Sequence, residues 1–234
     1  KSMNLTETLP SWYLGNNPDK SVIEVSYNDT FAEKFGLMNR RKVDEYGQEL
    51  FGIRIARDSR KKSDFELADR RGSMRSRGVK AGITGNPCHL MIIDDPIRNR
   101  EEADSPAMRQ KLIAGWHDDM KSRFSAGAKI ILILTRWHEE DLAGYLIKND
   151  PYVTVLRLPC ECDSHDDPLG RQIGDALCPE IGKDNNWLQG FKRSMTRKEG
   201  TRSWNALYQG KPSSEQGNLI RRDWWKWYDF GQAG

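Results

Sequence analysis

The sequence predicts an α/β fold with a mainly parallel central sheet flanked by helices. Two apolar stretches, residues 90–93 and 130–134, are long enough for strands and contain no polar break. Continuous apolar runs of this length, bounded by turn residues, are typical of strands buried on both faces of a parallel sheet. A helical pattern lies between the two stretches, and strands that alternate with helices indicate parallel pairing with right-handed crossovers.

The N-terminal part is predicted to form a helix, a strand and a longer helix. Residues 3–9 favour a helix, which Pro10 would kink unless the helix ends early. Residues 21–27 have the composition of a strand. Asn28, Asp29 and Thr30 together offer an N-cap for a helix that continues unevenly to Leu50. Further along, we expect a short edge strand at residues 65–67, another strand at 72–79 and a tight turn at 82–87.

The clearest helix signal begins at Ser105, which is a suitable N-cap, and Pro106, which fits the first turn. Apolar residues then recur every fourth position, at Met108, Leu112, Trp116 and Met120. This stripe predicts a core-facing helix, which Gly127 should end. The later elements that we expect are a strand at 129–134, a helix whose first turn carries Glu139, Glu140 and Asp141, a strand at 153–158, a loop at 159–184, and helices at 187–198 and 201–209.

The length of 234 residues fits one domain, or one domain with a small appendage. No stretch approaches the roughly 20 apolar residues of a membrane span, and no signal peptide is visible. Four cysteines in a chain of this length do not predict a disulfide scaffold, so we expect a reduced intracellular setting.

Basic residues are clustered, although the net charge is only +3. One cluster contains Arg70, Arg71, Arg75, Arg77 and Lys80, and a second consists of Arg221, Arg222 and Lys226 among Trp224, Trp225 and Trp227. Basic side chains beside flat aromatic rings suit nucleic acid, because phosphate contacts supply much of the affinity. The alternative for each cluster is a solvated charged surface.

Two adjacent carboxylates, Asp94 and Asp95, directly follow the first apolar stretch, and Pro96 then ends the strand. Open α/β sheets bind ligands at the carboxyl ends of their strands. This is the arrangement of a Walker B strand, in which one Asp holds the Mg²⁺ of a nucleotide and the next carboxylate orients or deprotonates the attacking water. The alternative is a surface turn that holds two acids after a core strand.

The chain begins with Lys1 and Ser2, followed by a segment that can be helical. A glycine-rich phosphate loop ends in Gly-Lys-Ser or Gly-Lys-Thr and opens directly into a helix. The glycines and the strand of such a loop do not precede this dipeptide in the sequence. Either residues upstream are omitted, or the dipeptide is a coincidence.

Thr135 follows the second apolar stretch. In a P-loop ATPase with an added strand beside Walker B, that strand ends in a small polar residue facing the γ-phosphate. A hydroxyl there can register whether the phosphate is present and pass the signal to the next helix. The alternative is that Thr135 caps the helix that begins near Glu139.

In their order, these motifs resemble the ATPase domain of a tailed-bacteriophage terminase large subunit, and the resemblance covers nearly the whole chain. The matching segments are Lys1 and Ser2 and residues 12–20, 92–96, 134–138, 167–180 and 206–212. The resemblance implies a P-loop NTPase fold of the ASCE or RecA-like class, with a small C-terminal lid. It also implies ATP hydrolysis that drives double-stranded DNA into a procapsid.

The resemblance implies roles for individual residues. Lys1 matches the Walker A lysine that neutralises the β- and γ-phosphates, and Ser2 matches the hydroxyl ligand of Mg²⁺. Asp94 matches the Walker B carboxylate, which is tied to Mg²⁺ through its water shell. Asp95 falls where the catalytic carboxylate lies, although many relatives in the wider superfamily have Glu there. Thr135 matches the ATPase-coupling motif.

The partners implied by the resemblance are double-stranded DNA, the portal protein, the small terminase subunit and further copies of the chain in a ring on the portal. The setting is the host cytoplasm during virion assembly, outside the mature virion, with no membrane. A neighbouring subunit would donate an arginine worth ~10³–10⁵ in rate. Arg75 and Arg77 are the candidates, and solvated arginines are the alternative. Arg222 and Lys226 are candidates for DNA contact.

Cys160, Cys162, His165 and Cys178 have the residue types of a four-ligand zinc site. Their C-x-C start is less usual than C-x₂-C, and related terminases have no metal in this loop, so we expect no structural zinc. The sequence 138–142 is not a metalloprotease motif, because Leu142 stands where the second His would be.

We expect an ATPase domain at residues 1–212, with a core at 1–158 and a lid at 159–212, and a linker at 213–234 toward a nuclease domain. The carboxylates of that nuclease are absent from the sequence, so no DNA cleavage is expected from this chain, which should be monomeric without the portal. Two alternatives stay open, namely a superfamily-2-type helicase or remodelling ATPase domain, and a DNA-binding module with a degenerate nucleotide site.

Overall fold

The computed structural model describes residues 1–59, 61, 64–81, 83, 85–198 and 200–213. The chain divides into two compact units. The first unit comprises residues 1–135 and 140–153, and the second comprises residues 136–139 and the chain from Thr154 onward. The division lies a few residues before the boundary expected after residue 158. The two units are described separately.

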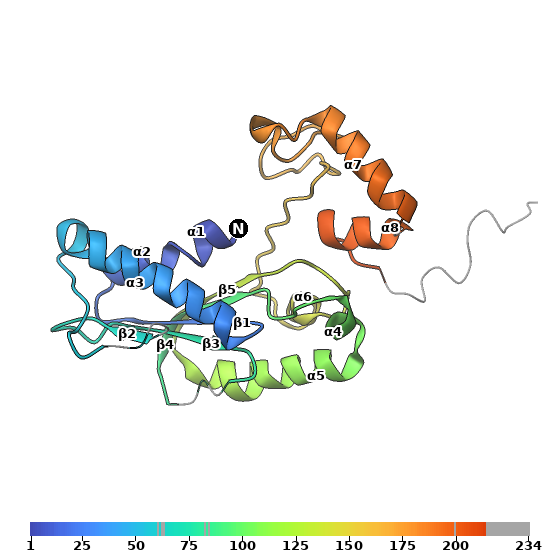
Figure 1. Ribbon diagram of the computed structural model, residues 1–234. Coiled ribbons are helices and arrows are strands. Elements are labelled where there is room, and N and C mark those ends of the chain that lie inside the picture. Colours follow the sequence, from blue (N-terminus) through green and yellow to red (C-terminus); the bar gives the residue numbers. More distant parts are fainter. Residues whose placement is uncertain (60, 62–63, 82, 84, 199, 214–234) are drawn as a thin grey trace, which may run out of the picture. The chain divides into compact units, whose positions relative to one another are not determined.

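The first unit contains a five-stranded sheet with the order β2-β3-β1-β4-β5 (Figure 1). Its strands are β1 (Ser21–Ser26), β2 (Asp64–Glu66), β3 (Ser73–Gly78), β4 (Cys88–Asp94) and β5 (Phe124–Ile133). The pairs β1–β3, β1–β4 and β4–β5 are parallel, and of the described strands only the short edge strand β2 runs antiparallel, beside β3. The expected α/β fold with a mainly parallel sheet is therefore confirmed.

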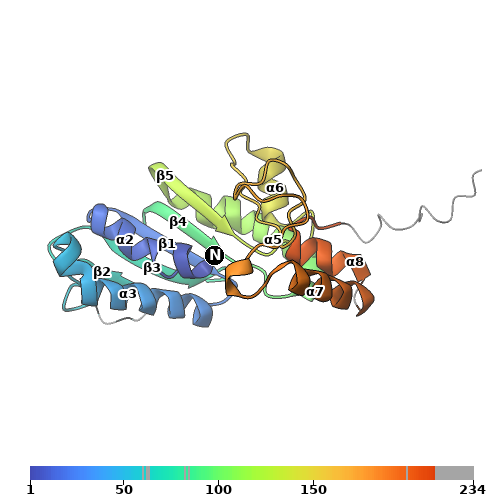
Figure 2. The same ribbon diagram turned by 90° about the horizontal axis from the view of Figure 1, so that it is seen from above.

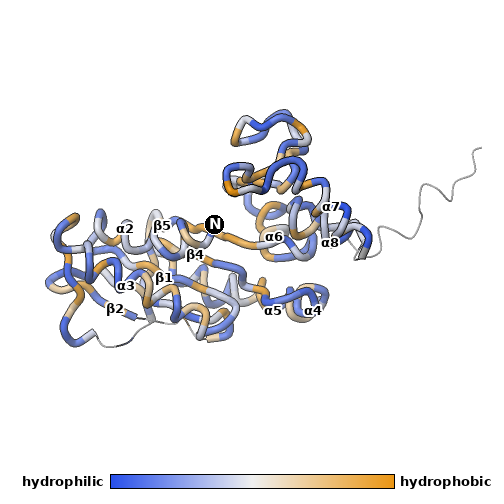
Figure 3. Tube along the Cα trace, turned by 45° about the horizontal axis from the view of Figure 1, so that its top comes forward, coloured by the Kyte–Doolittle hydropathy of each residue, from blue (hydrophilic) through white to orange (hydrophobic). Residues whose placement is uncertain are grey.

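The central strands β1 and β4 are almost entirely buried. In the hydropathy colouring of Figure 3, β4 is hydrophobic along most of its length, as a strand covered on both faces requires. β5 differs, because many of its residues are partly exposed and Ile130 is 39% exposed. In the described part of the chain, β5 is the last strand of the sheet, so burial along it is incomplete.

The helices cover both faces of the sheet (Figure 2). α2 (Leu9–Asn16) and α3 (Asp29–Phe51) cover one face, where Leu14, Val43 and Ile92 belong to one apolar cluster. α5 (Pro106–Gly115) and α6 (Leu142–Asn149) pack against the other face, in a cluster around Ile93. The core-facing helix expected from the four-residue repeat is confirmed. Blue and orange alternate along α3 in Figure 3, as expected for a helix with one buried side.

The N-terminal helix expected at residues 3–9 is divided into α1 (Ser2–Leu5) and α2. Pro10 lies in the first turn of α2, where its missing N–H is not needed, so it begins a helix and does not kink one. The expected N-cap of α3 is confirmed, since the Asn28 side chain accepts a hydrogen bond from Phe31 N at 2.8 Å.

Two expected boundaries around α5 and α6 are wrong. The chain leaves the helical path after two short turns, η1 (Trp116–Met120) and η2 (Lys121–Arg123), so β5 begins at Phe124, where the Trp116 and Phe124 rings pack edge to face. Gly127, with φ of +73°, therefore lies inside a strand whose register shifts, and does not end a helix. The acids at 139–141 precede α6, and Asp141 caps it by accepting from Gly144 N at 2.8 Å. α4 (Arg100–Asp104) was not expected.

Residues 153–158 do not form the expected strand. Val155 and Leu156 are 57% and 70% exposed, and the segment has no strand partner in the described chain. β-Branched residues favour a strand only where a neighbouring strand pairs with them. The sequence pattern was therefore misleading here.

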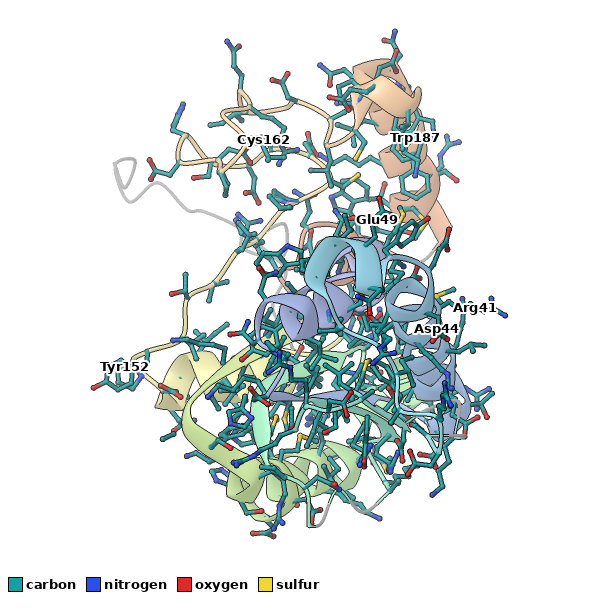
Figure 4. All side chains as sticks on the ribbon, turned by 90° about the vertical axis from the view of Figure 1, so that its left-hand side faces the viewer. Arg41, Asp44, Glu49, Tyr152, Cys162 and Trp187 are labelled. Carbon is teal, nitrogen blue, oxygen red and sulfur yellow. The ribbon has the colours of Figure 1, made fainter. Side chains whose placement is uncertain are left out.

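The second unit is organised around an aromatic cluster. Its helical elements are η3 (Pro179–Ile181), α7 (Asn185–Lys198), α8 (Gly200–Ser203) and η4 (Trp204–Tyr208). Trp187 and Phe191 stack with ring centroids 4.8 Å apart, and Trp204 and Tyr208 stack at 5.5 Å. Figure 4 labels Trp187 on α7 and Cys162 in the loop of the same unit. No helix among the described residues has both the length and the apolar character needed to cross a membrane.

Candidate active site

The first unit brings several polar side chains to the carboxyl edge of its parallel strands. Ser26 of β1 pairs with Gly78 of β3 and with Asp94 of β4, and Asp94 pairs with Ile133 of β5. These four strands therefore end at the same level. Asp94 is the last residue of β4 and Asp95 follows it directly, as the sequence predicted.

The Asp94 side chain is buried, and the residue is 1% exposed. Its Oδ2 accepts a hydrogen bond from Thr6 Oγ1 at 2.7 Å. Its Oδ1 has no hydrogen-bond partner among the described residues. A buried carboxylate oxygen without a partner carries a free-energy cost, so this atom needs a ligand to compensate it.

Asp95 is locked to the segment that follows β5. Its backbone N donates to Ile133 O at 2.9 Å, and its Oδ1 accepts from Thr135 N at 2.9 Å. Its φ of +44° lies in the left-handed region, which Asp tolerates better than most residues. Burial and the neighbouring charge of Asp94 raise the pKa of the Asp95 carboxyl, whereas the Thr135 amide and Lys1 oppose that rise.

Lys1 also lies at this edge. Its Nζ donates to Leu134 O at 3.1 Å, and its charge acts on Asp95. Ser2 begins α1 and is half-buried. Asp94 takes its hydrogen bond from Thr6, one helical turn beyond Ser2. Thr135 is half-buried beside Asp95 and does not cap α6, because Asp141 does.

A second buried carboxylate, Glu24 of β1, lies behind Asp94 on the sheet face covered by α2 and α3. Glu24 is fully buried, and its Oε1 accepts from Ser26 Oγ at 2.6 Å. Burial, together with the charge of Asp94, raises the pKa of Glu24 to about 8 in spite of the Ser26 hydroxyl. The sequence analysis missed this residue, although a single acid inside a central strand was a signal that could have found it.

Arg75 and Arg77 lie on β3 and form ion pairs with the edge strand β2. Arg75 Nη2 lies 2.5 Å from Glu66 Oε1, and Arg77 binds both carboxylate oxygens of Asp64 at 2.5 and 2.7 Å. The hydrogen bond with Asp64 raises the pKa of Arg77. The structure therefore gives both arginines partners within their own chain.

The residues at the edge fit a magnesium ion bound with a nucleotide. Mg²⁺ prefers oxygen ligands and usually takes one or two carboxylates together with substrate phosphates and water. The carboxylates of Asp94 and Asp95 and the hydroxyl of Ser2 are oxygen donors, and Asp94 Oδ1 lacks a partner. The described residues contain no group of three or more His, Cys, Asp or Glu able to hold a metal by themselves, which such a site does not require.

The cysteine loop lies in the second unit. Cys162 is buried, and its Sγ donates to Ser164 O at 3.3 Å and to Arg171 O at 3.5 Å. Among the described residues, Cys160, Cys162, His165 and Cys178 do not form a group of three or more side chains placed to hold a metal ion. Arg222 and Lys226 lie outside the described residues.

Comparison with known families decides the classification. The family model for the N-terminal part of the T4-like-virus type of terminase large subunit matches residues 1–226. The chain belongs to this terminase family. A search of curated proteins finds no match. Among solved structures, the terminase domain is similar to the large terminase of bacteriophage HK97, with a TM-score of 0.47 and 16% identity over 83% of this chain. The chain spans 40% of the length of that HK97 protein.

Proposed function

We propose that this terminase domain binds Mg·ATP at the carboxyl edge of its sheet and hydrolyses it to drive double-stranded DNA into a procapsid. The observation that carries the proposal is the convergence of Lys1, Asp94, Asp95 and Thr135, which come from three separate parts of the sequence. One cationic and two anionic side chains at a strand edge match the needs of a metal-bound triphosphate.

Each residue has a role in this proposal. Lys1 neutralises phosphate charge, and Ser2 and Asp94 hold the magnesium, which supplies charge neutralisation when bound. Asp95 orients the attacking water and accepts its proton. The raised pKa of Asp95 brings the carboxyl nearer to the pH at which a general base is most effective. Its side chain accepts a hydrogen bond from Thr135 N, so a change at Asp95 during hydrolysis can be passed to the segment after β5.

Family membership supports a wider assembly as part of the proposal. Further copies of the chain, the portal protein and the small terminase subunit are the proposed partners, in the host cytoplasm. Arg75 and Arg77 stay candidates for the arginine donated to a neighbouring subunit. Either would have to exchange its carboxylate partner on β2 for phosphate, since both are paired within the chain.

The first test is Lys1→Ala in the full-length protein. We expect nucleotide affinity to fall about 10–100-fold, because a hydrogen bond from a charged group contributes ~1.5–3 kcal/mol. Isothermal titration calorimetry with a non-hydrolysable ATP analogue measures this affinity. Lys20→Ala is the matched control, since Lys20 precedes β1 at the opposite edge of the sheet and is exposed. Wild-type affinity in Lys1→Ala would contradict the assignment.

The second test concerns DNA. The logarithm of the DNA affinity should fall linearly with the logarithm of the salt concentration, and each phosphate contact contributes about 0.9 to the steepness of that line. Neutralising Arg222 and Lys226 together should therefore make the slope shallower by ~2. Fluorescence anisotropy across a salt series measures the slope. DNA-stimulated ATP hydrolysis would separate an ATPase from a DNA-binding module with a degenerate site, and strand separation would favour the helicase alternative.

A further inference from the structure

The short break between α1 and α2 lies directly against the proposed magnesium site. Thr6 occupies this break and is fully buried. Its backbone N donates to Ser2 O at 2.8 Å, so Thr6 is linked to the helical turn that begins with Ser2. Its Oγ1 reaches Asp94 Oδ2 across 88 positions of sequence.

The break is held from the other side by Asn39 of α3, which is fully buried as well. Asn39 Nδ2 donates to Thr6 O at 2.8 Å and to Phe35 O at 3.0 Å, and its Oδ1 accepts from Ser11 N at 3.0 Å. The Asn39 side-chain amide therefore binds both Thr6 in the break and Ser11 in α2. Lys42, nearly one turn further along α3, adds a hydrogen bond from Nζ to Glu7 O at 2.7 Å.

These contacts restrict the Asp94 carboxylate. A threonine side chain has few rotamers, and here its backbone is fixed by hydrogen bonds on both N and O. The hydroxyl therefore approaches Asp94 from one direction and occupies Oδ2. Oδ1 is left without a partner among the described residues, in a carboxylate that cannot reorient toward solvent.

We propose that Thr6, held in place by Asn39, is a positioning residue that orients Asp94 so that Oδ1 is presented to the hydrated magnesium of the bound nucleotide. The inference rests on the proposed function and adds to it a residue outside the phosphate-loop and Walker B motifs. Groups that orient a metal ligand typically change metal affinity 10–100-fold when they are removed.

The test compares Thr6→Val, Thr6→Ala and Thr6→Ser in the full-length protein. Affinity for a non-hydrolysable ATP analogue is measured by titration calorimetry with magnesium and with EDTA, so the readout does not depend on turnover. We expect Thr6→Val and Thr6→Ala to bind the analogue like the wild type in EDTA. Their magnesium gain, which is the ratio of the affinity with magnesium to the affinity in EDTA, should be at least about 10-fold smaller than that of the wild type. Thr6→Ser retains the hydroxyl and should keep that gain.

Thr8→Val is the matched control. Thr8 lies in the same break, but it is exposed and its hydroxyl donates to Met3 O at 2.9 Å, away from Asp94. It should keep the full magnesium gain. Thermal unfolding identifies any variant that does not fold, and the smaller Ala and Ser variants give the comparison if Thr6→Val fails.

Two results with the Thr6 variants would overturn the inference. One is a full magnesium gain without the hydroxyl, in Thr6→Val or in Thr6→Ala. The other is a loss in Thr6→Ser equal to that in Thr6→Ala. If the wild type itself shows no magnesium-dependent nucleotide binding, the proposed function fails and the inference fails with it. An active wild type with insensitive Thr6 variants overturns the inference alone.

Discussion

Asp95→Asn should leave Mg·ATP binding intact and reduce ATP turnover by about 10²–10⁴-fold, the range typical of a lost general base. The fold should tolerate the change, since Asn adopts the left-handed conformation at least as readily as Asp, and its side-chain oxygen can still accept from Thr135 N. What the amide cannot do is accept a proton from water. Steady-state turnover and analogue affinity, measured on the same preparation, separate the two effects.

The chain offers a closely matched control for this variant. Asp69 is the other non-glycine residue with positive φ among the described residues, with φ of +58°. It lies in the turn between β2 and β3, where its carboxylate is exposed and 3.6 Å from Arg54. Asp69→Asn makes the same chemical change in the same backbone conformation and should keep wild-type turnover. Unchanged turnover in Asp95→Asn would remove Asp95 from the catalytic role.

Glu24→Gln should make the domain more stable at pH 8.5 by several kcal/mol, because each unit of pKa shift corresponds to about 1.4 kcal/mol. The pKa of Glu24 rises from 4.5 to about 8 in the folded chain, mainly through burial. Below pH 4.5 the side chain is neutral in both states and the shift has no effect. Between pH 4.5 and 8 the unfolded chain releases a proton that the folded chain keeps, so stability falls. Above pH 8 the side chain is ionised in both states, and the loss of stability stays constant.

Glutamine has the shape of the neutral acid and can accept from Ser26, so it should remove this part of the pH dependence. Urea unfolding of both proteins at pH 5 and pH 8.5 measures the difference. Glu49→Gln serves as the control, since Glu49 is exposed on α3, as Arg41 and Asp44 are (Figure 4), and should change little. Parallel pH profiles for wild type and Glu24→Gln would contradict the prediction.

Local signals predicted much of the fold. Ser105 and Asn28 cap their helices by contacts within three residues, so their role is visible in a short window of sequence. The central strand β4 is covered on both faces, and such a strand must be apolar at successive positions. The same strand carries Asp94 to its carboxyl end, and Asp95 follows it. The sequence therefore located the edge of the sheet where the proposed chemistry lies.

Errors arose where the outcome depended on distant partners. Residues 153–158 have strand composition but find no pairing strand in the described chain. Residues 124–126 were expected to belong to the helix that Gly127 ends, but Phe124 starts β5 opposite Cys88. A strand exists only if its neighbour supplies the other half of the hydrogen bonds, and composition does not reveal that neighbour.

The sequence by itself determined the α/β class, the buried central strand and the paired acids at its end, because each depends on burial and on contacts between near neighbours in the chain. Only the tertiary structure decided that Thr6 holds Asp94, that Asn39 holds Thr6 and that Glu24 is buried behind them. The two hydrogen bonds join residues that are 88 and 33 positions apart. The state of Glu24 depends on its complete removal from water. Packing alone brings Thr6, Asn39 and Asp94 together, and no local pattern specifies it, whereas Glu24 left a local signal as a single acid inside a central strand.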